Sequence, residues 1–260
     1  MDVGWYIILI FCLAFAWLYR FVVSELAKLR MQTGRGRLIS LDALKKTRNS
    51  VFMLSMSRNE EPVGVGVFCA AGKAVTAAHN LGFRRTTSVF GCFGPGDTSG
   101  APAEGFRLRV VSRDDELDIA VLECDRSYVH SHFLELFRGN PDILVGESMA
   151  LCAFQLALRE DVPEFHACLG VMPAVGIKIS SAERHVVYAC NTWGGNSGGA
   201  LLMYDGQLVG IHLALVNALR ETLERKLVVE ERLDSVEASL NEVVRGVSSG
   251  CVALLASQFP

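Results

Sequence analysis

The chain has 260 residues, half of them hydrophobic and a fifth charged, with a formal net charge of −3. This composition excludes a disordered chain and allows one large globular domain or two small ones. The weak negative charge gives no reason to expect a nucleic-acid partner. The eight cysteines contain no C-x-x-C pair and the histidines show no metal-ligand spacing, so we expect no metal ion and no other cofactor.

The most apolar segment is residues 3–23, V-G-W-Y-I-I-L-I-F-C-L-A-F-A-W-L-Y-R-F-V-V. Its length approaches the ~20 residues of a membrane-spanning helix, and tryptophan and tyrosine lie near both ends, as in an aromatic belt. A cleaved signal peptide is the alternative, but it requires a basic start and a small-residue cleavage site. Neither is present, so we assign residues 1–23 to an uncleaved transmembrane anchor.

The charges that flank this segment predict its orientation. Lysine and arginine are absent before the uninterrupted apolar run Val3–Tyr19 and frequent after it, from Arg20 to Lys46. The positive-inside rule therefore places the body of the protein on the cytoplasmic side of a single-pass anchor, and scattered cysteines agree with a reducing compartment. Residues 24–47 read as a basic, partly helical linker.

From residue 48 the sequence changes to short apolar or alternating runs, separated by glycine, aspartate and asparagine. Examples are V-G-V-G-V-F-C-A, F-R-L-R-V-V-S, H-V-V-Y-A-C and Q-L-V-G-I-H-L. Such a series predicts an all-β domain, either a sandwich or a barrel. Asp205-Gly206 predicts a hairpin turn between two strands, and C-V-A-L-L-A-S near the end predicts one more strand.

Residues 213–245 differ from the strands, because leucine and valine recur there at helical spacing among charged residues. We expect an amphipathic helix or a helical hairpin. It either packs against the β-domain or forms a helix-mediated contact with a partner or a second copy of the chain.

Ser197 lies in N-T-W-G-G-N-S-G-G, among four glycines. A serine hydroxyl needs a base, a carboxylate that orients the base, and N–H groups for the oxyanion before it can attack a carbonyl. T-A-A-H-N supplies His79 after a strand-like run, and L-D-I-A-V-L supplies Asp118 before another. Each motif alone has a common structural explanation, but together their order and contexts predict a triad of His79, Asp118 and Ser197.

The three motifs resemble those of chymotrypsin-fold, trypsin-like serine proteases. The resemblance covers roughly residues 48–215 and the final strand, so we assign 48–260 to the protease domain with 213–245 as a helical insertion. It implies two antiparallel six-stranded β-barrels, a site between them, and a protein or peptide substrate. It also implies that His79 is the general base, that Asp118 orients it, that Ser197 forms the acyl-enzyme, and that the N–H groups of Gly195 and Ser197 make the oxyanion hole.

The chain departs from extracellular trypsins in two informative ways. Asn80 follows His79 where those enzymes have a cysteine, and the cysteines do not match the trypsin disulfide pattern. Asn196 precedes Ser197 where trypsins have the aspartate that binds the N-terminus released on zymogen cleavage. We therefore expect a reduced enzyme without the trypsin activation switch.

Specificity is expected to depend on Asn191, Thr192 and His212. Asn191 lies six residues before Ser197, at the base of the S1 pocket in trypsins, so an acidic floor for Lys or Arg is missing. Thr192 and His212 resemble the pocket residues of glutamyl endopeptidases and of viral chymotrypsin-like proteases, which cut after Glu or Gln. A hydroxyl and an imidazole N–H can both donate to such side chains.

These observations favour a membrane-anchored serine endopeptidase that cuts after Glu or Gln. A viral-type polyprotein-processing protease fits the same residues. The alternative of a different class is a catalytically silent protease-fold scaffold that binds partners.

Overall fold

The computed structural model describes residues 39–58, 60–82, 86–94, 105–125, 128, 130–157, 166–192, 194–230, 235–245, 247 and 249–260. The expected transmembrane anchor, residues 1–23, lies outside this described part, as does the expected linker up to residue 38. Within the described part, no helix is both long and apolar enough to cross a bilayer. The described residues belong to one compact unit, Leu38–Pro260.

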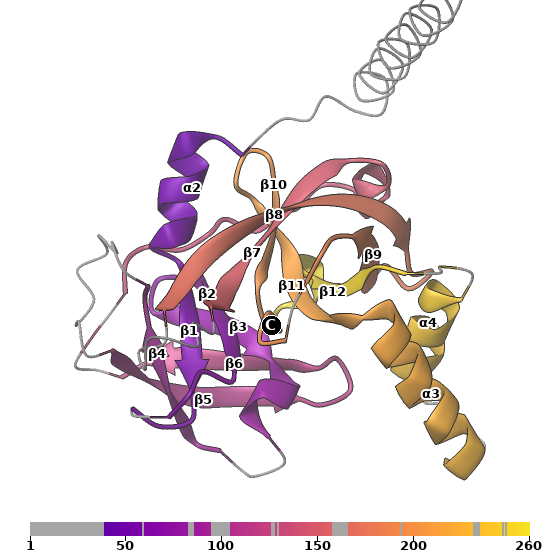
Figure 1. Cartoon of the computed structure of the whole chain (residues 1–260), viewed down its shortest axis with the longest axis horizontal. Coiled ribbons are helices and arrows are strands. Elements are labelled where there is room, and N and C mark those ends of the chain that lie inside the picture. The colour runs from indigo at the N-terminus through magenta and orange to yellow at the C-terminus, as the bar shows by residue number, and fades with distance from the viewer. Residues whose placement is uncertain are drawn as a thin grey trace, which may run out of the picture. The chain divides into compact units, whose positions relative to one another are not determined.

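The first half of this unit is a closed antiparallel barrel with the strand order β1-β2-β3-β6-β5-β4 (Figure 1). Its strands are β1 (Val51–Ser55), β2 (Gly64–Ala70), β3 (Lys73–Ala77), β4 (Ser88–Cys92), β5 (Phe106–Asp114) and β6 (Ile119–Cys124). The short runs identified in the sequence form these strands because β-branched and aromatic side chains pack well on a pleated surface. The barrel interior holds a cluster of four phenylalanine rings, Phe52, Phe68, Phe93 and Phe106.

The second half is another closed antiparallel barrel, with the order β10-β11-β12-β9-β8-β7. Its strands are β7 (Ser148–Ala157), β8 (His166–Ile179), β9 (His185–Ala189), β10 (Ala200–Met203), β11 (Leu208–Leu215) and β12 (Cys251–Leu255). Asp205-Gly206 makes the predicted turn between β10 and β11, where the N–H of Gly206 donates to the carbonyl of Met203 at 3.0 Å. The expectation of two six-stranded antiparallel barrels is therefore confirmed.

Helix α2 (Leu41–Arg48) occupies the last part of the expected linker. The side chain of Ser40 caps it by accepting the N–H of Ala43 at 3.1 Å. Ala43 and Thr47 are buried, and a Cβ added to Gly206 would lie 2.8 Å from the Ala43 Cβ. The helix is therefore packed closely on the β10–β11 turn.

The helical segment expected at 213–245 is present, with different bounds. Strand β11 continues to Leu215, and two helices follow, α3 (Val216–Glu230) and α4 (Ser235–Val244). Their apolar side chains form a cluster with Val187 of β9 and Val252 of β12. The hairpin α3–α4 thus packs on the second barrel (Figure 1), as the first of the two sequence-based alternatives expected.

Candidate active site

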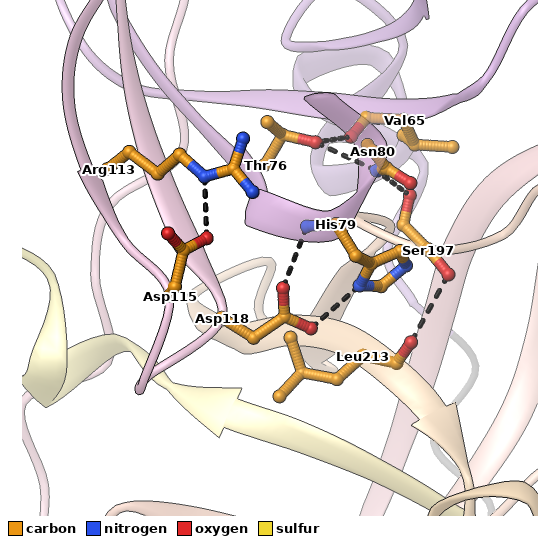
Figure 2. Close-up of polar contacts among 9 residues, drawn as sticks. All are labelled: Val65, Thr76, His79, Asn80, Arg113, Asp115, Asp118, Ser197 and Leu213. Carbon is orange, nitrogen blue, oxygen red and sulfur yellow. Dashed lines mark hydrogen bonds and ion pairs between the residues drawn. The ribbon is translucent and has the colours of Figure 1, made fainter. Parts of the chain in front are cut away.

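His79 and Asp118 are held together at the edge of the first barrel. His79 lies in a short 3-10 helix, η1 (Ala78–Leu81), that follows β3, and Asp118 directly precedes β6. Asp118 Oδ2 is 2.7 Å from His79 Nδ1, and Asp118 Oδ1 accepts the backbone N–H of His79 at 2.9 Å (Figure 2). Both side chains remain partly exposed, by 48% for His79 and 29% for Asp118, so a substrate can reach the imidazole.

The backbone at Asp118 is strained. Its φ of 55° lies in the left-handed region, which costs most residues 1–2 kcal/mol and is tolerated best by glycine, asparagine and aspartate. The preceding turn is stabilised by Asp114, whose Oδ1 accepts the N–H groups of Glu116 and Leu117. The Asp118 carbonyl also accepts the N–H of Ala78 at 3.0 Å. These bonds hold an unfavourable conformation that presents both carboxylate oxygens to His79.

Ser197 lies on a turn of the second barrel, just before β10. Gly195 and Gly198 on either side have φ values of 87° and 85°, which explains why glycine is needed there. The Ser197 hydroxyl donates to the carbonyl oxygen of Leu213 at 3.2 Å rather than to His79 (Figure 2). The hydroxyl is thus turned toward β11.

A buried set of polar contacts, which we call the polar seam, joins the two barrels behind these residues. It comprises Val65, Thr76, Asn80 and the backbone of Ser197. The Asn80 amide donates to Thr76 Oγ1 at 3.0 Å and to the Ser197 carbonyl at 2.9 Å. The same carbonyl accepts the N–H of Val65 at 2.8 Å, and Thr76 Oγ1 donates to the Val65 carbonyl at 2.7 Å. In the sequence, Asn80 was noted only because it replaces the cysteine of extracellular trypsins. Its position next to His79 was the one signal that it could join the two barrels.

Two glycines make room for the polar seam. A Cβ added to Gly64 would lie 2.3 Å from the Asn80 amide nitrogen, and one added to Gly198 would lie 2.0 Å from the Val65 carbonyl oxygen. A side chain at Gly198 would require a backbone shift, and one at Gly64 would displace the Asn80 amide from its hydrogen bonds.

The expected oxyanion donors, Gly195 and Ser197, share the turn with Asn196. Neither of their N–H groups donates to a carbonyl of the described residues. Asn196 is 1% exposed, and its amide donates to the Phe154 carbonyl of β7 at 3.0 Å. The side chain that replaces the trypsin aspartate therefore ties the turn to the second barrel.

The three expected specificity residues differ in their surroundings. Asn191 and Thr192 line an open hollow of about 770 Å³ together with Cys190, Leu215 and Gly250. His212 is not among the described lining residues of that hollow. It is 3% exposed on β11.

The charge of His212 follows from its surroundings. Burial, together with the nearby His79, lowers the pKa of His212 to about 4, so the ring is neutral at pH 7. Its Nδ1 is 2.7 Å from the hydroxyl of Tyr188, and burial raises the pKa of that hydroxyl well above its ordinary value. A protonated tyrosine hydroxyl can donate to Nδ1, and in that arrangement the imidazole proton lies on Nε2.

Within the described part of the chain, no group of three or more His, Cys, Asp or Glu side chains is arranged to hold a metal ion.

Comparisons with known proteins agree with this architecture. The model of the trypsin-like peptidase domain family matches residues 64–211, more than half of the chain. Among curated proteins, no sequence matches. The crystal structure of the inactive form of Rv3671c protease is similar, with a TM-score of 0.51 at 17% identity over 83% of this chain and 88% of that chain.

The active form of the same protease, from M. tuberculosis, has a TM-score of 0.51 at 17% identity over 83% of this chain and 79% of that chain. The human pathogenic astrovirus serine protease has a TM-score of 0.48 at 18% identity over 69% of this chain and 88% of that chain. The family match and the two-barrel fold lead to one conclusion: the chain belongs to the trypsin-like peptidase domain family and is a serine endopeptidase.

Proposed function

We propose that the protein hydrolyses peptide bonds through a triad of His79, Asp118 and Ser197. The observation that carries this proposal is the pair of hydrogen bonds from Asp118 to the ring and backbone of His79. With Nδ1–H donating to Asp118, the other ring nitrogen is the one that can accept the proton of Ser197.

The reaction requires one rotation of the serine side chain. The hydroxyl turns from the Leu213 carbonyl to the imidazole, His79 takes its proton, and Ser197 Oγ attacks the scissile carbonyl. The imidazolium, stabilised by Asp118, then protonates the leaving amine. Water attacks the acyl-enzyme while His79 takes a proton from the water, and His79 returns this proton to Ser197 Oγ. The N–H groups of Gly195 and Ser197 stabilise the oxyanion, at about 10²–10³-fold in turnover for each donor of this kind.

We further propose that the enzyme cuts after glutamine in preference to glutamate. His212 is buried and neutral, so its Nε2–H can donate to the side-chain carbonyl of glutamine. A glutamate side chain would bring a charge into a site that offers no opposite charge, which costs free energy. The hydroxyl of Thr192, in the adjacent hollow, is the second donor.

The triad is tested with the purified full-length protein and a fluorophosphonate probe. Labelling should occur at Ser197 and disappear in Ser197→Ala and in His79→Ala. The folded wild-type protein remaining unlabelled would instead support the silent scaffold.

The specificity is tested with a peptide library. Glutamine should exceed glutamate at the position before the cut by at least about tenfold, since the site offers no opposite charge to a carboxylate that loses its water. His212→Ala should abolish this preference, and Tyr188→Phe should weaken it while fluorophosphonate labelling persists. A profile dominated by Arg, Phe or Ala would contradict the proposal.

Membrane anchoring through residues 3–23, with the protease facing the cytoplasm, is also proposed from the sequence. The support is the apolar run and the lysines and arginines that follow it. The full-length protein should remain with membranes after alkaline extraction, and release into the soluble fraction would contradict the anchor.

A further inference from the structure

Arg113 lies near the end of β5 and contacts the two segments that carry the catalytic pair. Its Nη1 donates to the carbonyl oxygen of Gly82 at 2.7 Å, and its Nε donates to Asp115 Oδ1 at 2.6 Å (Figure 2). Gly82 directly follows η1, the short helix of His79, whereas Asp115 belongs to the turn that precedes Asp118. The guanidinium group therefore bridges these two segments outside the hydrogen bonds of the catalytic pair.

A β-bulge gives Arg113 this direction. Arg109 lies opposite Glu123, and both side chains are exposed on the outer face of the barrel. The register then shifts just after Val110, so that Arg113 lies opposite Ala120, which is fully buried in the interior cluster of the first barrel. Opposite residues of an antiparallel pair project to the same face of the sheet. The bulge thus turns Arg113 away from the outer face, a use of bulges that is common beside active sites.

The helix that carries His79 depends on contacts outside itself. A 3-10 helix of four residues has hydrogen bonds of poor geometry. It ends at Gly82, which has a φ of 64° and whose N–H donates to the His79 carbonyl at 3.0 Å. The carbonyl of the same glycine accepts the bond from Arg113. A single residue therefore connects the backbone of His79 to the guanidinium group.

The two contacts of Arg113 have different weights. The Asp115 side chain is 72% exposed, so its ion pair contributes little free energy by itself. It does orient the guanidinium group, whose donors have a fixed planar geometry. The Arg113 side chain is 25% exposed, so water competes less strongly for its bond to Gly82. The bond to the Gly82 carbonyl is thus the contact that carries the inference.

We propose that Arg113 is a positioning residue for the His79–Asp118 pair. Its contacts hold η1 and the turn before Asp118 at a fixed separation, and His79 Nε2 thereby keeps the position from which it accepts the Ser197 proton. This inference rests on the proposed function, because the position of His79 matters through that proton transfer. A misplacement of about 1 Å can cost about 10²-fold in rate.

The experiment compares Arg113→Met with Arg109→Met in the full-length protein. Each variant removes one ion pair from the same strand, but only Arg113→Met also removes the bond to Gly82. For a peptide that the wild type cleaves, kcat should fall about tenfold in Arg113→Met with little change in KM, and Arg109→Met should keep the wild-type kcat. The rate of fluorophosphonate labelling should fall by a similar factor, because this probe offers no peptide side chain for Arg113 to contact.

An NMR measurement separates this inference from the proposed function. The proton between His79 Nδ1 and Asp118 Oδ2 lies in a short hydrogen bond to a carboxylate and is strongly deshielded. Its signal, assigned by its absence in His79→Ala, reports the geometry of the pair without any turnover. In the Ser197→Ala background the signal should shift or broaden when Arg113→Met is added, and it should stay unchanged when Arg109→Met is added.

The possible failures are distinguishable. Wild-type protein that remains unlabelled would overturn the proposed function, and the NMR comparison would still test the contacts of Arg113. Labelled protein in which Arg113→Met and Arg109→Met give the same kcat or the same NMR signal would overturn the role of Arg113 alone. Urea unfolding of the two variants should agree, and an Arg113→Met protein that loses its fold would also overturn a role in positioning.

Discussion

Two regions near His79 are built from different chemistry. The polar seam fixes Ser197 to the first barrel through Val65, Thr76 and Asn80, with bonds of 2.7–3.0 Å. The hairpin α3–α4 contributes Leu219, Leu223 and Leu240 to a hollow whose described lining also includes His79. Hydrogen bonds are directional and costly to leave unmade, whereas apolar packing tolerates changes of shape as long as volume is kept.

This difference in chemistry assigns separate tasks to the polar seam and to the hairpin. The polar seam sets the distance between catalytic groups that come from different barrels, and an error of about 1 Å there can cost about 10²-fold in rate. The hairpin carries none of the residues of the polar seam, so a substitution there should leave those distances nearly unchanged. A substitution in the polar seam should therefore lower the rate for every substrate, and one in the hairpin should lower it much less.

The largest effect is expected for Gly198→Ala. The new Cβ would lie 2.0 Å from the Val65 carbonyl oxygen and 2.7 Å from Thr76 Oγ1, at a φ of 85°. The clash and the backbone strain together should lower the free energy of unfolding by more than about 3 kcal/mol and kcat/KM by about 100-fold or more.

Gly146→Ala is the matched control for strain without a clash. Gly146 has a φ of 79°, and nothing lies within 4 Å of an added Cβ. It should lose only about 1–2 kcal/mol of stability and keep its activity. Equal loss of activity in the two variants, measured by denaturant unfolding and peptide hydrolysis, would break the claim that the polar seam sets the catalytic distances.

A smaller effect is expected for Asn80→Ala. It removes two buried hydrogen bonds, to Thr76 Oγ1 and to the Ser197 carbonyl, at a cost of about 1–3 kcal/mol. Because the Ser197 carbonyl loses one of its two bonds to the first barrel, kcat should fall about tenfold or more with little change in KM, for every peptide substrate.

Asn140→Ala separates stability from positioning. Asn140 caps η2 (Pro141–Leu144) by accepting the N–H of Asp142 at 3.0 Å, and loss of a cap costs about 1 kcal/mol. This exposed site should lose stability without loss of kcat. A fall in kcat equal to that of Asn80→Ala would show that Asn80 acts through stability only.

The sequence allowed prediction of those parts of the site that depend on short contiguous motifs. T-A-A-H, D-I-A-V-L and G-N-S-G-G each place one side chain at a strand end, and the barrel then brings His79 and Asp118 together. The strands themselves were predictable because apolar runs and turn residues are local signals.

Contacts between distant residues were not predictable in the same way. Asn80 and Ser197 are 117 positions apart, and no local pattern reveals that the Asn80 amide reaches the serine carbonyl. The bond from Tyr188 to His212 joins two strands that each read as ordinary core. The apolar periodicity of the hairpin predicted helices but could not show that Leu117 and Leu219 face one hollow.

The smallest effect is expected for the dependence of stability on pH, through His185 on the strand that the hairpin covers. His185 is fully buried at the start of β9, and neither ring nitrogen has a hydrogen-bond partner among the described residues. Burial and the nearby Arg184 lower the pKa of His185 to about 4, although Asp118 acts in the opposite direction. It alternates with Val186 and so shares the face of β9 with Val187, which the hairpin covers.

The sign follows from the depressed pKa. Between about pH 6.5 and pH 4, His185 is protonated in the unfolded chain but remains neutral in the folded protein. The free energy of unfolding therefore falls as the pH falls. The loss should be about 1 kcal/mol between pH 6 and pH 5 for His185, and His212 adds a similar amount because its pKa is also about 4. His185→Leu should remove about half of this pH dependence, measured by urea unfolding.

Hydrogen exchange of the wild type at pH 5 should show faster opening in α3 and α4 than in the strands of the polar seam. Equal acceleration of exchange in both regions would contradict the division between the hairpin and the polar seam.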